Sequence, residues 1–229
     1  VVGWGKTVGC IASTIAVELD RPGHINRNVK LGGTERVIFS IGEVHGRITP
    51  RVKKLSQMLA CIDSSEVTTN LWGKRWSKLM VNCMRNPVSA ATGRGGNAND
   101  RDDHTRRLAV RLAGEAGRIG VALGYELGLV YKIEPQLLMA AEQGDSGAMA
   151  QCEEQLLANT TFRNDDNRPS MGQDMLKGRR TEIDYLNGLV VQKAAELGLP
   201  VPANEGIAEV VRRIERGEIL AGPNAVAHL

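Results

Sequence analysis

The chain has 229 residues, of which 42% are hydrophobic and 24% are charged, a composition typical of one large globular domain or two small ones. Its formal net charge of +3 is mild, its lysines and arginines form no long run, and its aromatic content is only 3%, so nucleic acid is not an expected partner. The apolar runs are too short to span a bilayer, so a membrane is not an expected partner either.

The chain opens with a glycine-rich segment, V-V-G-W-G-K-T-V-G, that could be a phosphate-binding turn or an ordinary strand. A dinucleotide fingerprint needs a strand before it and a crossover helix after it. Only C-I-A-S separates Gly9 from Thr14, where the next strand begins, and this leaves no room for a crossover helix. A strand or loop with glycines near a sheet edge is therefore the favoured interpretation, and a phosphate site is the alternative.

Short strands are predicted between these glycines and about residue 48. T-I-A-V-E-L-D at 14–20 alternates apolar and polar side chains, as a strand with one buried face does. R-P-G at 21–23 suits a type II turn, because proline presets φ and glycine accepts a positive φ. Two further strands are predicted in I-N-R-N-V-K-L and R-V-I-F-S-I-G. Together these segments predict a small antiparallel meander.

Apolar side chains adopt a helical period after about residue 50. A first helix is predicted in R-V-K-K-L-S-Q-M-L-A. Its expected apolar stripe consists of Val52, Leu55, Met58 and Leu59. A long helix is expected over 67–92, with a kink or break at Asn86–Pro87, since proline has no N–H for a helical hydrogen bond.

The rest of the chain is also predicted to be helical. Shorter helices are expected over residues 105–123, 134–143, 146–159, 171–178, 183–197 and 203–217. The predicted fold class is therefore mainly α, with a small β meander followed by an all-helical domain. We place the boundary between the two domains after residue 50, so that they cover 1–50 and 51–229.

Neither a metal site nor a disulfide is expected. The cysteines are widely spaced and include no C-x-x-C pair; they are Cys10, Cys61, Cys83 and Cys152. Reduced core thiols in a cytoplasmic protein are the favoured interpretation. Asp102, Asp103 and His104 precede a predicted helix, where acidic residues are ordinary, and a metal role for them is the disfavoured alternative.

The segment W-S-K-L-M-V-N-C-M-R-N-P, at 76–87, carries the most informative polar residues. Lys78, Asn82 and Asn86 are spaced i, i+4 and i+8, so on a helix they form one polar row among apolar neighbours. A lysine and two amides on a largely buried helix are costly unless they serve each other or a ligand. A row that is simply solvated remains the alternative.

A second polar segment lies at 168–188, in R-P-S-M-G-Q-D-M-L-K-G-R-R-T-E-I-D-Y-L-N-G. Ser170 and Gln173 fit a capping box for a short helix. Thr181 is a plausible N-cap for the next helix, which would place Glu182 in its first turn. Glu182 is therefore either a partner of the helix dipole or a functional carboxylate.

Together the two segments resemble ketopantoate reductase (2-dehydropantoate 2-reductase). The resemblance extends over essentially the whole chain, is strongest in these two segments, and continues through G-L-P-V-P-A-N. It implies a two-domain, NADPH-dependent oxidoreductase that reduces 2-dehydropantoate to pantoate in pantothenate and coenzyme A biosynthesis. It also implies an N-terminal Rossmann domain, a helical C-terminal domain like that of 6-phosphogluconate dehydrogenase, and an active site in the cleft between them.

The same resemblance implies roles for the two most reactive side chains. Lys78 would be the general acid that protonates the ketone oxygen as hydride arrives. Glu182 would hold the substrate hydroxyl and act on Lys78. These roles suit the chemistry, because hydride addition builds negative charge on oxygen, which an ammonium group stabilises and protonates.

Four further residues are implied to bind the 2-keto acid substrate. Asn82 and Asn86 would contact its oxygens, since amides can donate to a carbonyl or accept from a hydroxyl. Ser170 would hold its carboxylate. Arg179 is expected close to this group.

Two departures from the family pattern affect these expectations. The family's glycine turn and its other NADPH-binding residues are expected upstream of residue 1, because residues 1–50 resemble only the C-terminal remnant of the Rossmann domain. This chain alone is therefore expected to be inactive and to bind NADPH weakly. In addition, Arg85 stands where an apolar residue is expected, and Gly172 is small beside Ser170, so the substrate range is open.

Two alternatives follow from these departures. The first is a related reductase that acts on another 2-keto acid or on an imine. The second is a helical dimerisation module without activity, which an intact set of polar site residues argues against. For each of these interpretations a homodimer is a candidate assembly, because the chain has long helices without a full partner domain.

Overall fold

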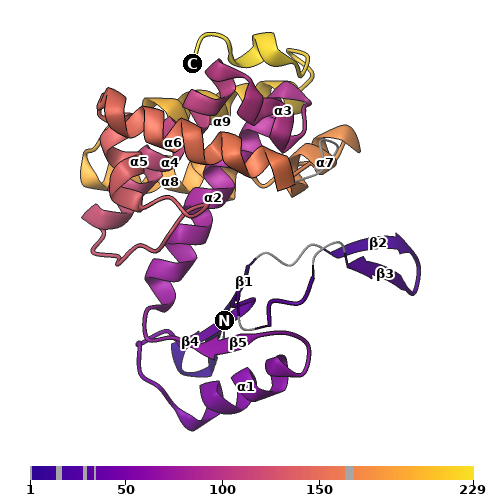
Figure 1. Ribbon diagram of the computed structural model, residues 1–229, viewed down its shortest axis with the longest axis vertical. Coiled ribbons are helices and arrows are strands. Elements are labelled where there is room, and N and C mark those ends of the chain that lie inside the picture. Colours follow the sequence, from indigo (N-terminus) through magenta and orange to yellow (C-terminus); the bar gives the residue numbers. More distant parts are fainter. Residues whose placement is uncertain (1, 14–16, 28–29, 34, 163–167) are drawn as a thin grey trace. The chain divides into compact units, whose positions relative to one another are not determined.

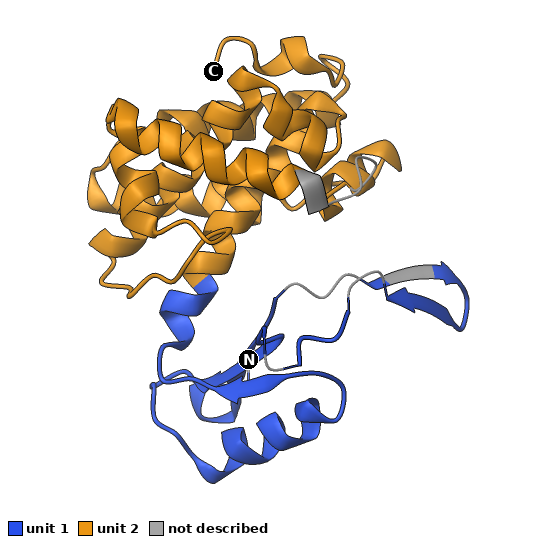
Figure 2. Cartoon of the chain, in the orientation of Figure 1, with its two compact units in different colours: residues 1–75 blue, residues 76–229 orange. Residues whose placement is uncertain are grey.

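The computed structural model describes residues 2–13, 17–27, 30–33, 35–162 and 168–229 (Figure 1). The chain forms two compact units, Val1–Arg75 and Trp76–Leu229 (Figure 2). Each unit has its own buried apolar core, so we describe each by itself.

The smaller unit contains a three-stranded sheet in the order β1-β4-β5. Its strands are β1 (Val8–Ala12), β4 (Phe39–Glu43) and β5 (Ser65–Val67). β1 runs antiparallel to β4, whereas β5 runs parallel to β4. Parallel neighbours need a crossover, and α1 (Pro50–Ala60) supplies it (Figure 1). The unit therefore holds one complete βαβ element.

A separate hairpin forms the second sheet of the smaller unit. It pairs β2 (Val17–Arg21) with β3 (His24–Arg27), and Gly23 in the turn has φ +82°. The predicted R-P-G turn is therefore confirmed, although residues 14–16 of the predicted first strand lie outside the described residues. The single antiparallel meander is wrong, because β2 and β3 pair only with each other and β4 pairs in parallel with β5.

The opening glycines belong to an edge strand and the turn before it. Trp4–Lys6 forms a short 3-10 turn, and Gly9 lies in β1, at the edge of the sheet. A Cβ at Gly9 would lie 2.5 Å from the δ-carbons of Leu71, so close packing explains this glycine. The favoured interpretation of the opening segment is confirmed.

Helix α1 packs on the sheet through only part of the predicted stripe, since Val52 and Leu59 contact the core and Leu55 and Met58 do not. Val52 is fully buried and Ser56 is 9% exposed, whereas Met58 is 59% exposed and Leu55 also lies on the exposed face. Ser56 turns inward because its hydroxyl lies 2.9 Å from that of Ser65 in β5. Because α1 and β5 both pack on β4, the first unit extends to Arg75, past the boundary predicted after residue 50.

The regular elements described in the larger unit are helices, joined by loops and by one isolated bridge between Val130 and Ile133 (Figure 1). Helix α2 (Leu71–Thr92) enters it from the smaller unit. The others are α3 (Gly96–Arg101), α4 (Asp103–Ala122), α5 (Pro135–Glu142), α6 (Ser146–Ala158), α7 (Ser170–Leu176), α8 (Asn187–Leu197) and α9 (Pro202–Glu215). Helix α4 is central, because it contacts α3, α5, α6, α8 and α9. The mainly α fold class is confirmed.

Most predicted helices occur within a few residues of their expected bounds. The exceptions are local: residues 65–67 form β5, α3 was not expected, and the helix predicted over 183–197 is split at Leu186, which has φ −104° and ψ −92°. Of the kink or break expected at Asn86–Pro87, the break does not occur, because α2 is continuous through Pro87. Among the helices that the structure describes, none combines the length and hydropathy that crossing a membrane requires.

Candidate active site

The polar row of α2 runs from the surface into the larger unit. Lys78 is exposed, Asn82 is half-buried and Asn86 is only 6% exposed. Because residues four apart share one face of a helix, all three side chains leave α2 on the same side. The burial of Asn86 argues against a row that is simply solvated. Lys78 is the exposed end of this polar row, and Asn86 is its buried end.

The opposite face of α2 belongs to the core, and this fixes the orientation of the row. Met80, Cys83 and Met84 are fully buried, and burial raises the pKa of the Cys83 thiol. Trp76 packs on the same side, where its indole Nε1 donates to the carbonyl of Ala116 at 2.7 Å. The amphipathic pattern of the sequence therefore sets which way Lys78, about half a turn beyond Trp76, leaves the helix.

Pro87 has no N–H, so the carbonyl oxygen of Cys83 in α2 receives no helical hydrogen bond from it. The side-chain Nδ2 of Asn187 donates to this oxygen at 3.2 Å and also to Oδ1 of Asn204 at 2.9 Å. Both asparagines are fully buried. This substitute donor explains how α2 continues through Pro87, and no local sequence signal could have revealed it.

A buried carboxylate completes this polar network. Glu115 of α4 accepts hydrogen bonds from the backbone N–H groups of Ala203 and Asn204, both at 2.9 Å. It also accepts from Nδ2 of Asn204 at 2.7 Å. Burial raises the pKa of Glu115, which the three donors oppose. Glu115 thereby caps the N-terminus of α9, where Val201 and Pro202 supply no cap.

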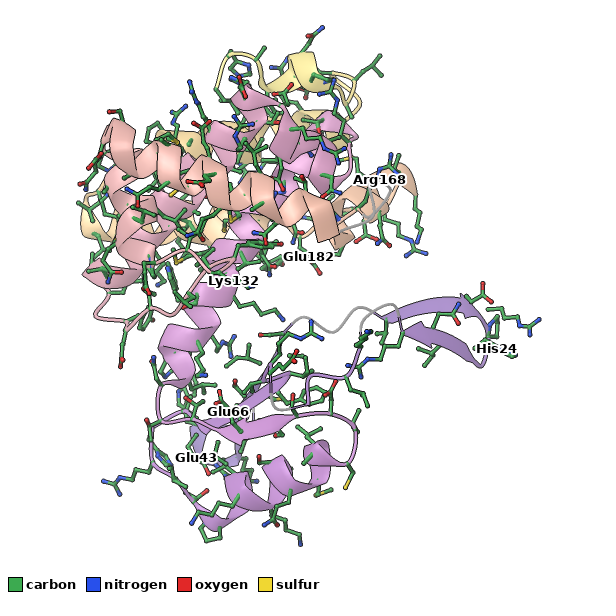
Figure 3. The ribbon with its side chains drawn as sticks, in the orientation of Figure 1. His24, Glu43, Glu66, Lys132, Arg168 and Glu182 are labelled. Carbon is green, nitrogen blue, oxygen red and sulfur yellow. The ribbon has the colours of Figure 1, made fainter. Side chains whose placement is uncertain are left out.

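Glu182 lies at the surface of the larger unit, at the start of a 3-10 turn formed by Ile183–Tyr185 (Figure 3). Its backbone carbonyl accepts from the N–H groups of Tyr185 and Leu186, at 3.0 and 3.1 Å. Thr181 accepts the N–H of Ile183 through its hydroxyl at 3.3 Å, so it holds this turn rather than capping α8. The Glu182 side chain is exposed. The residues that follow Glu182 in the chain lead to Asn187.

Ser170 is the first residue of α7 and is exposed, so its hydroxyl faces the surface. The predicted capping box is wrong, because Pro169 occupies the N-cap position and Gln173 donates instead to the carbonyl of Arg168 at 2.9 Å. A Cβ on Gly172 would lie 2.5 Å from the Ser89 hydroxyl oxygen. The small residue beside Ser170 is therefore explained by the close approach of α7 to α2.

Arg179 lies beyond the end of α7, with its side chain 67% exposed and 3.8 Å from the Asp174 carboxylate. It lines a pocket of about 500 Å³ together with residues that include Gly172, Met175 and Ile214. The other five predicted site residues do not line this pocket. All six predicted site residues belong to the larger unit, but Arg179 lines a pocket that the polar row of α2 does not line.

Arg85 is buried inside the larger unit, at 6% exposure. Its guanidinium pairs with the fully buried Asp100 and stacks on the Tyr131 ring, 4.6 Å from the centroid. Tyr131 and the adjacent Lys132 have positive φ angles of 52° and 66°, which are uncommon for such side chains. The charge found at an expected apolar position is therefore neutralised internally.

The residues considered for metal binding have structural contacts. Asp102 caps α4, since its Oδ1 accepts the N–H of Thr105 at 3.0 Å, and this hydrogen bond lowers the pKa of Asp102. His104 contacts the carbonyl of Val226 through Nε2 at 2.8 Å. Within the described ranges, no three His, Cys, Asp or Glu side chains are grouped to hold a metal ion.

The four thiols are not paired with one another. The prediction of core thiols is confirmed for Cys83 and Cys152, which are buried, and is wrong for Cys10 and Cys61, which are exposed. Burial raises the pKa of Cys152 to about 11. The two buried thiols are therefore protonated packing residues at neutral pH.

The sequence matches one family model and several curated proteins. Residues 70–215 match the model described as ketopantoate reductase PanE/ApbA C terminal. The 2-dehydropantoate 2-reductase of Mesorhizobium japonicum is 30% identical over 221 residues, which are 94% of this chain and 58% of the relative. That of Archaeoglobus fulgidus is 25% identical over 178 residues, 77% of this chain and 52% of the relative. The chain thus spans little more than half of these relatives.

Solved structures share the fold at lower identity. A PanE/ApbA family ketopantoate reductase from Ralstonia eutropha has a TM-score of 0.68 at 24% identity. The match covers 92% of this chain and 60% of that structure's chain. D-mandelate dehydrogenase in complex with NADH and anilino(oxo)acetate has a TM-score of 0.67 at 19% identity, with coverages of 89% and 59%. A dimeric ketopantoate reductase from Staphylococcus aureus has a TM-score of 0.65 at 14% identity, with coverages of 93% and 63%.

Proposed function

The chain belongs to the ketopantoate reductase family, and we propose that the whole protein is a cytoplasmic, NADPH-dependent oxidoreductase that reduces 2-dehydropantoate to pantoate. The single observation that carries this proposal is the row of Lys78, Asn82 and Asn86, which runs inward from the surface of a family-matched helix. A lysine followed by two amides along one helix face is the arrangement that a ketone with neighbouring oxygens requires.

In the proposed reaction Lys78 donates a proton from Nζ to the ketone oxygen. Negative charge develops on that oxygen as the carbonyl carbon is reduced, and an adjacent ammonium stabilises the charge before the proton moves. The exposed carboxylate of Glu182 accepts a hydrogen bond from the substrate hydroxyl. The nicotinamide cofactor supplies the hydride when bound.

The remaining predicted residues bind and orient the substrate in this proposal. Asn82 and Asn86 donate amide hydrogens to substrate oxygens without changing charge. Ser170 offers an exposed hydroxyl to the carboxylate. Arg179 adds positive charge nearby, although its pocket is lined by none of the other five residues. Asn86 is therefore expected to matter more for substrate binding than Arg179.

The described residues of this chain do not fit a pyrophosphate-binding turn. Gly9 lies in an edge strand, and its α-carbon is covered by the Leu71 side chain. The next element that the structure describes after this strand is β2, not the helix that a dinucleotide turn opens. We therefore assign the cofactor's diphosphate to residues outside this chain.

Replacement of Lys78 by alanine tests the proposal. In the full-length protein Lys78→Ala should lower kcat for 2-dehydropantoate reduction by about 10²- to 10⁴-fold, the range typical of a lost general acid, while NADPH affinity stays unchanged. The matched control is Lys193→Ala, which removes a surface lysine paired with Glu196 in α8. Normal turnover by Lys78→Ala would overturn the assigned role.

A related reductase of another 2-keto acid is the second candidate. D-mandelate dehydrogenase, described in a ternary complex with NADH and anilino(oxo)acetate, shares this fold, so the fold also occurs in an enzyme named for a different 2-hydroxy acid. Comparison of kcat/KM across 2-dehydropantoate and aryl and branched 2-oxo acids distinguishes the candidates. A preference for 2-dehydropantoate supports the first, and a preference for another acid supports the second.

A homodimer is part of the same proposal. The ketopantoate reductase from Staphylococcus aureus is described as dimeric and shares the fold. Sedimentation of the full-length protein measures the assembly directly. A dimer without any reductase activity would instead support a non-catalytic dimerisation module.

A further inference from the structure

The backbone of α2 depends on a side chain from another helix at the middle of the polar row. Cys83 lies between Asn82 and Asn86, and its carbonyl would receive the N–H of residue 87 in a regular helix. Residue 87 is proline, so that donor does not exist. Nδ2 of Asn187 takes its place at 3.2 Å.

The side chain of Asn187 is itself held by the two hydrogen bonds that its Nδ2 donates. Its second amide hydrogen goes to Oδ1 of Asn204 at 2.9 Å, and its own Oδ1 has no hydrogen-bond partner among the residues described. The side chain is fully buried, so water cannot replace either bond at low cost. Loss of the amide would leave the Cys83 carbonyl without its donor.

Asn204, at the other end of this connection, is hydrogen-bonded to α4. Nδ2 of Asn204 donates to the carbonyl of Leu112 at 3.1 Å and to Glu115 at 2.7 Å, both in α4. Glu115 in turn caps the first turn of α9. Asn187 therefore joins α2 to the central helix of the unit through Asn204.

Asn187 also begins α8, directly after the short segment that starts at Glu182. One amide thus connects the backbone between Asn82 and Asn86 with the segment that carries the exposed carboxylate. We propose that Asn187 is a positioning residue that sets the geometry of the polar row of α2 by supplying the hydrogen bond that Pro87 cannot give to the Cys83 carbonyl. This inference rests on the proposed function of that row.

A pair of substitutions tests the inference, because alanine at position 87 restores the missing backbone donor. Asn187→Ala should lower kcat in the full-length protein by about 10- to 100-fold, as expected when catalytic groups are misplaced, with a smaller change in KM. Pro87→Ala/Asn187→Ala should recover most of that loss. A merely structural role would lower stability and leave kcat of the folded Asn187→Ala variant unchanged, so there would be no loss of kcat to recover.

Asn97→Ala is the matched control. Asn97 is also buried, and its Nδ2 donates to the carbonyl of Thr160 at the same 3.2 Å, but it belongs to α3. This variant should lose stability and keep kcat. Equal kcat values for Asn187→Ala and Asn97→Ala would overturn the inference, as would failure of Pro87→Ala to restore activity.

Amide hydrogen exchange provides a readout that does not depend on activity. Asn187→Ala should speed exchange in the part of α2 that follows Cys83, and the double variant should slow it again. Unchanged exchange in Asn187→Ala would overturn the inference. If Asn187→Ala folds poorly, the double variant is compared with Pro87→Ala alone, and the test still applies. Absence of reductase activity in the wild-type protein would instead contradict the proposed function and leave this exchange test decisive.

Discussion

Buried charges in this chain are held by partners from neighbouring segments, and Glu43 of β4 shows the consequence for pH. Its carboxylate is fully buried and accepts hydrogen bonds from Thr49 and Arg51, with Nε of Arg51 at 2.7 Å (Figure 3). The Arg51 guanidinium lowers the pKa of Glu43 from 4.5 to about 2, against the opposing effect of burial.

We predict that the smaller unit loses stability in acid through this residue. Because the folded pKa lies below the unfolded value, the stabilisation is fully present above pH 4.5 and is lost as the pH falls towards about 2. Amide exchange of β4 measures this loss. Glu43→Gln should be less stable near neutral pH and should show a flatter pH dependence in that window; an equally steep dependence would contradict the assignment.

At the same scale, the sequence predicts the polar row but not the residues that support it. Spacing alone places Lys78, Asn82 and Asn86 on one helix face. Asn187 is 104 residues from Cys83, so no local pattern could pair them. Arg85 similarly stands at an expected apolar position, and no local pattern could predict its contacts with Asp100 and the Tyr131 ring.

Among elements, helix ends and strand pairings show where local rules hold. Asp102 caps α4 as its position predicts, whereas Ser170 does not cap α7, because Pro169 takes the N-cap position. The parallel pairing of β4 with β5 could not be predicted from alternation, since it depends on how α1 packs. The helices predicted over 105–123, 134–143, 146–159 and 203–217 are confirmed as α4, α5, α6 and α9.

The cap of α4 yields a stability prediction. Asp102→Ala should destabilise the larger unit by about 1 kcal/mol, because the N–H of Thr105 loses its acceptor. Helical circular dichroism during urea unfolding measures the change. The neighbouring Asp103→Ala is the control, since its side chain is 80% exposed and should contribute less than about 0.5 kcal/mol. Equal losses in the two variants would contradict a specific cap.

For the whole molecule, the division into two units bears on cofactor binding. The smaller unit has a βαβ element but, within its described residues, no glycine turn that opens a helix. We therefore predict that this chain alone binds NADPH weakly or not at all. Isothermal titration calorimetry checks this, and micromolar affinity would contradict it and revive the opening glycines as a phosphate site.

The most direct test of the proposed function is the conversion of 2-dehydropantoate by the full-length wild-type protein with NADPH. NADPH oxidation and pantoate formation should proceed together and in equal amounts, and both should disappear in Lys78→Ala. Wild-type protein that oxidises no NADPH with 2-dehydropantoate, or that forms no pantoate while doing so, would contradict the account.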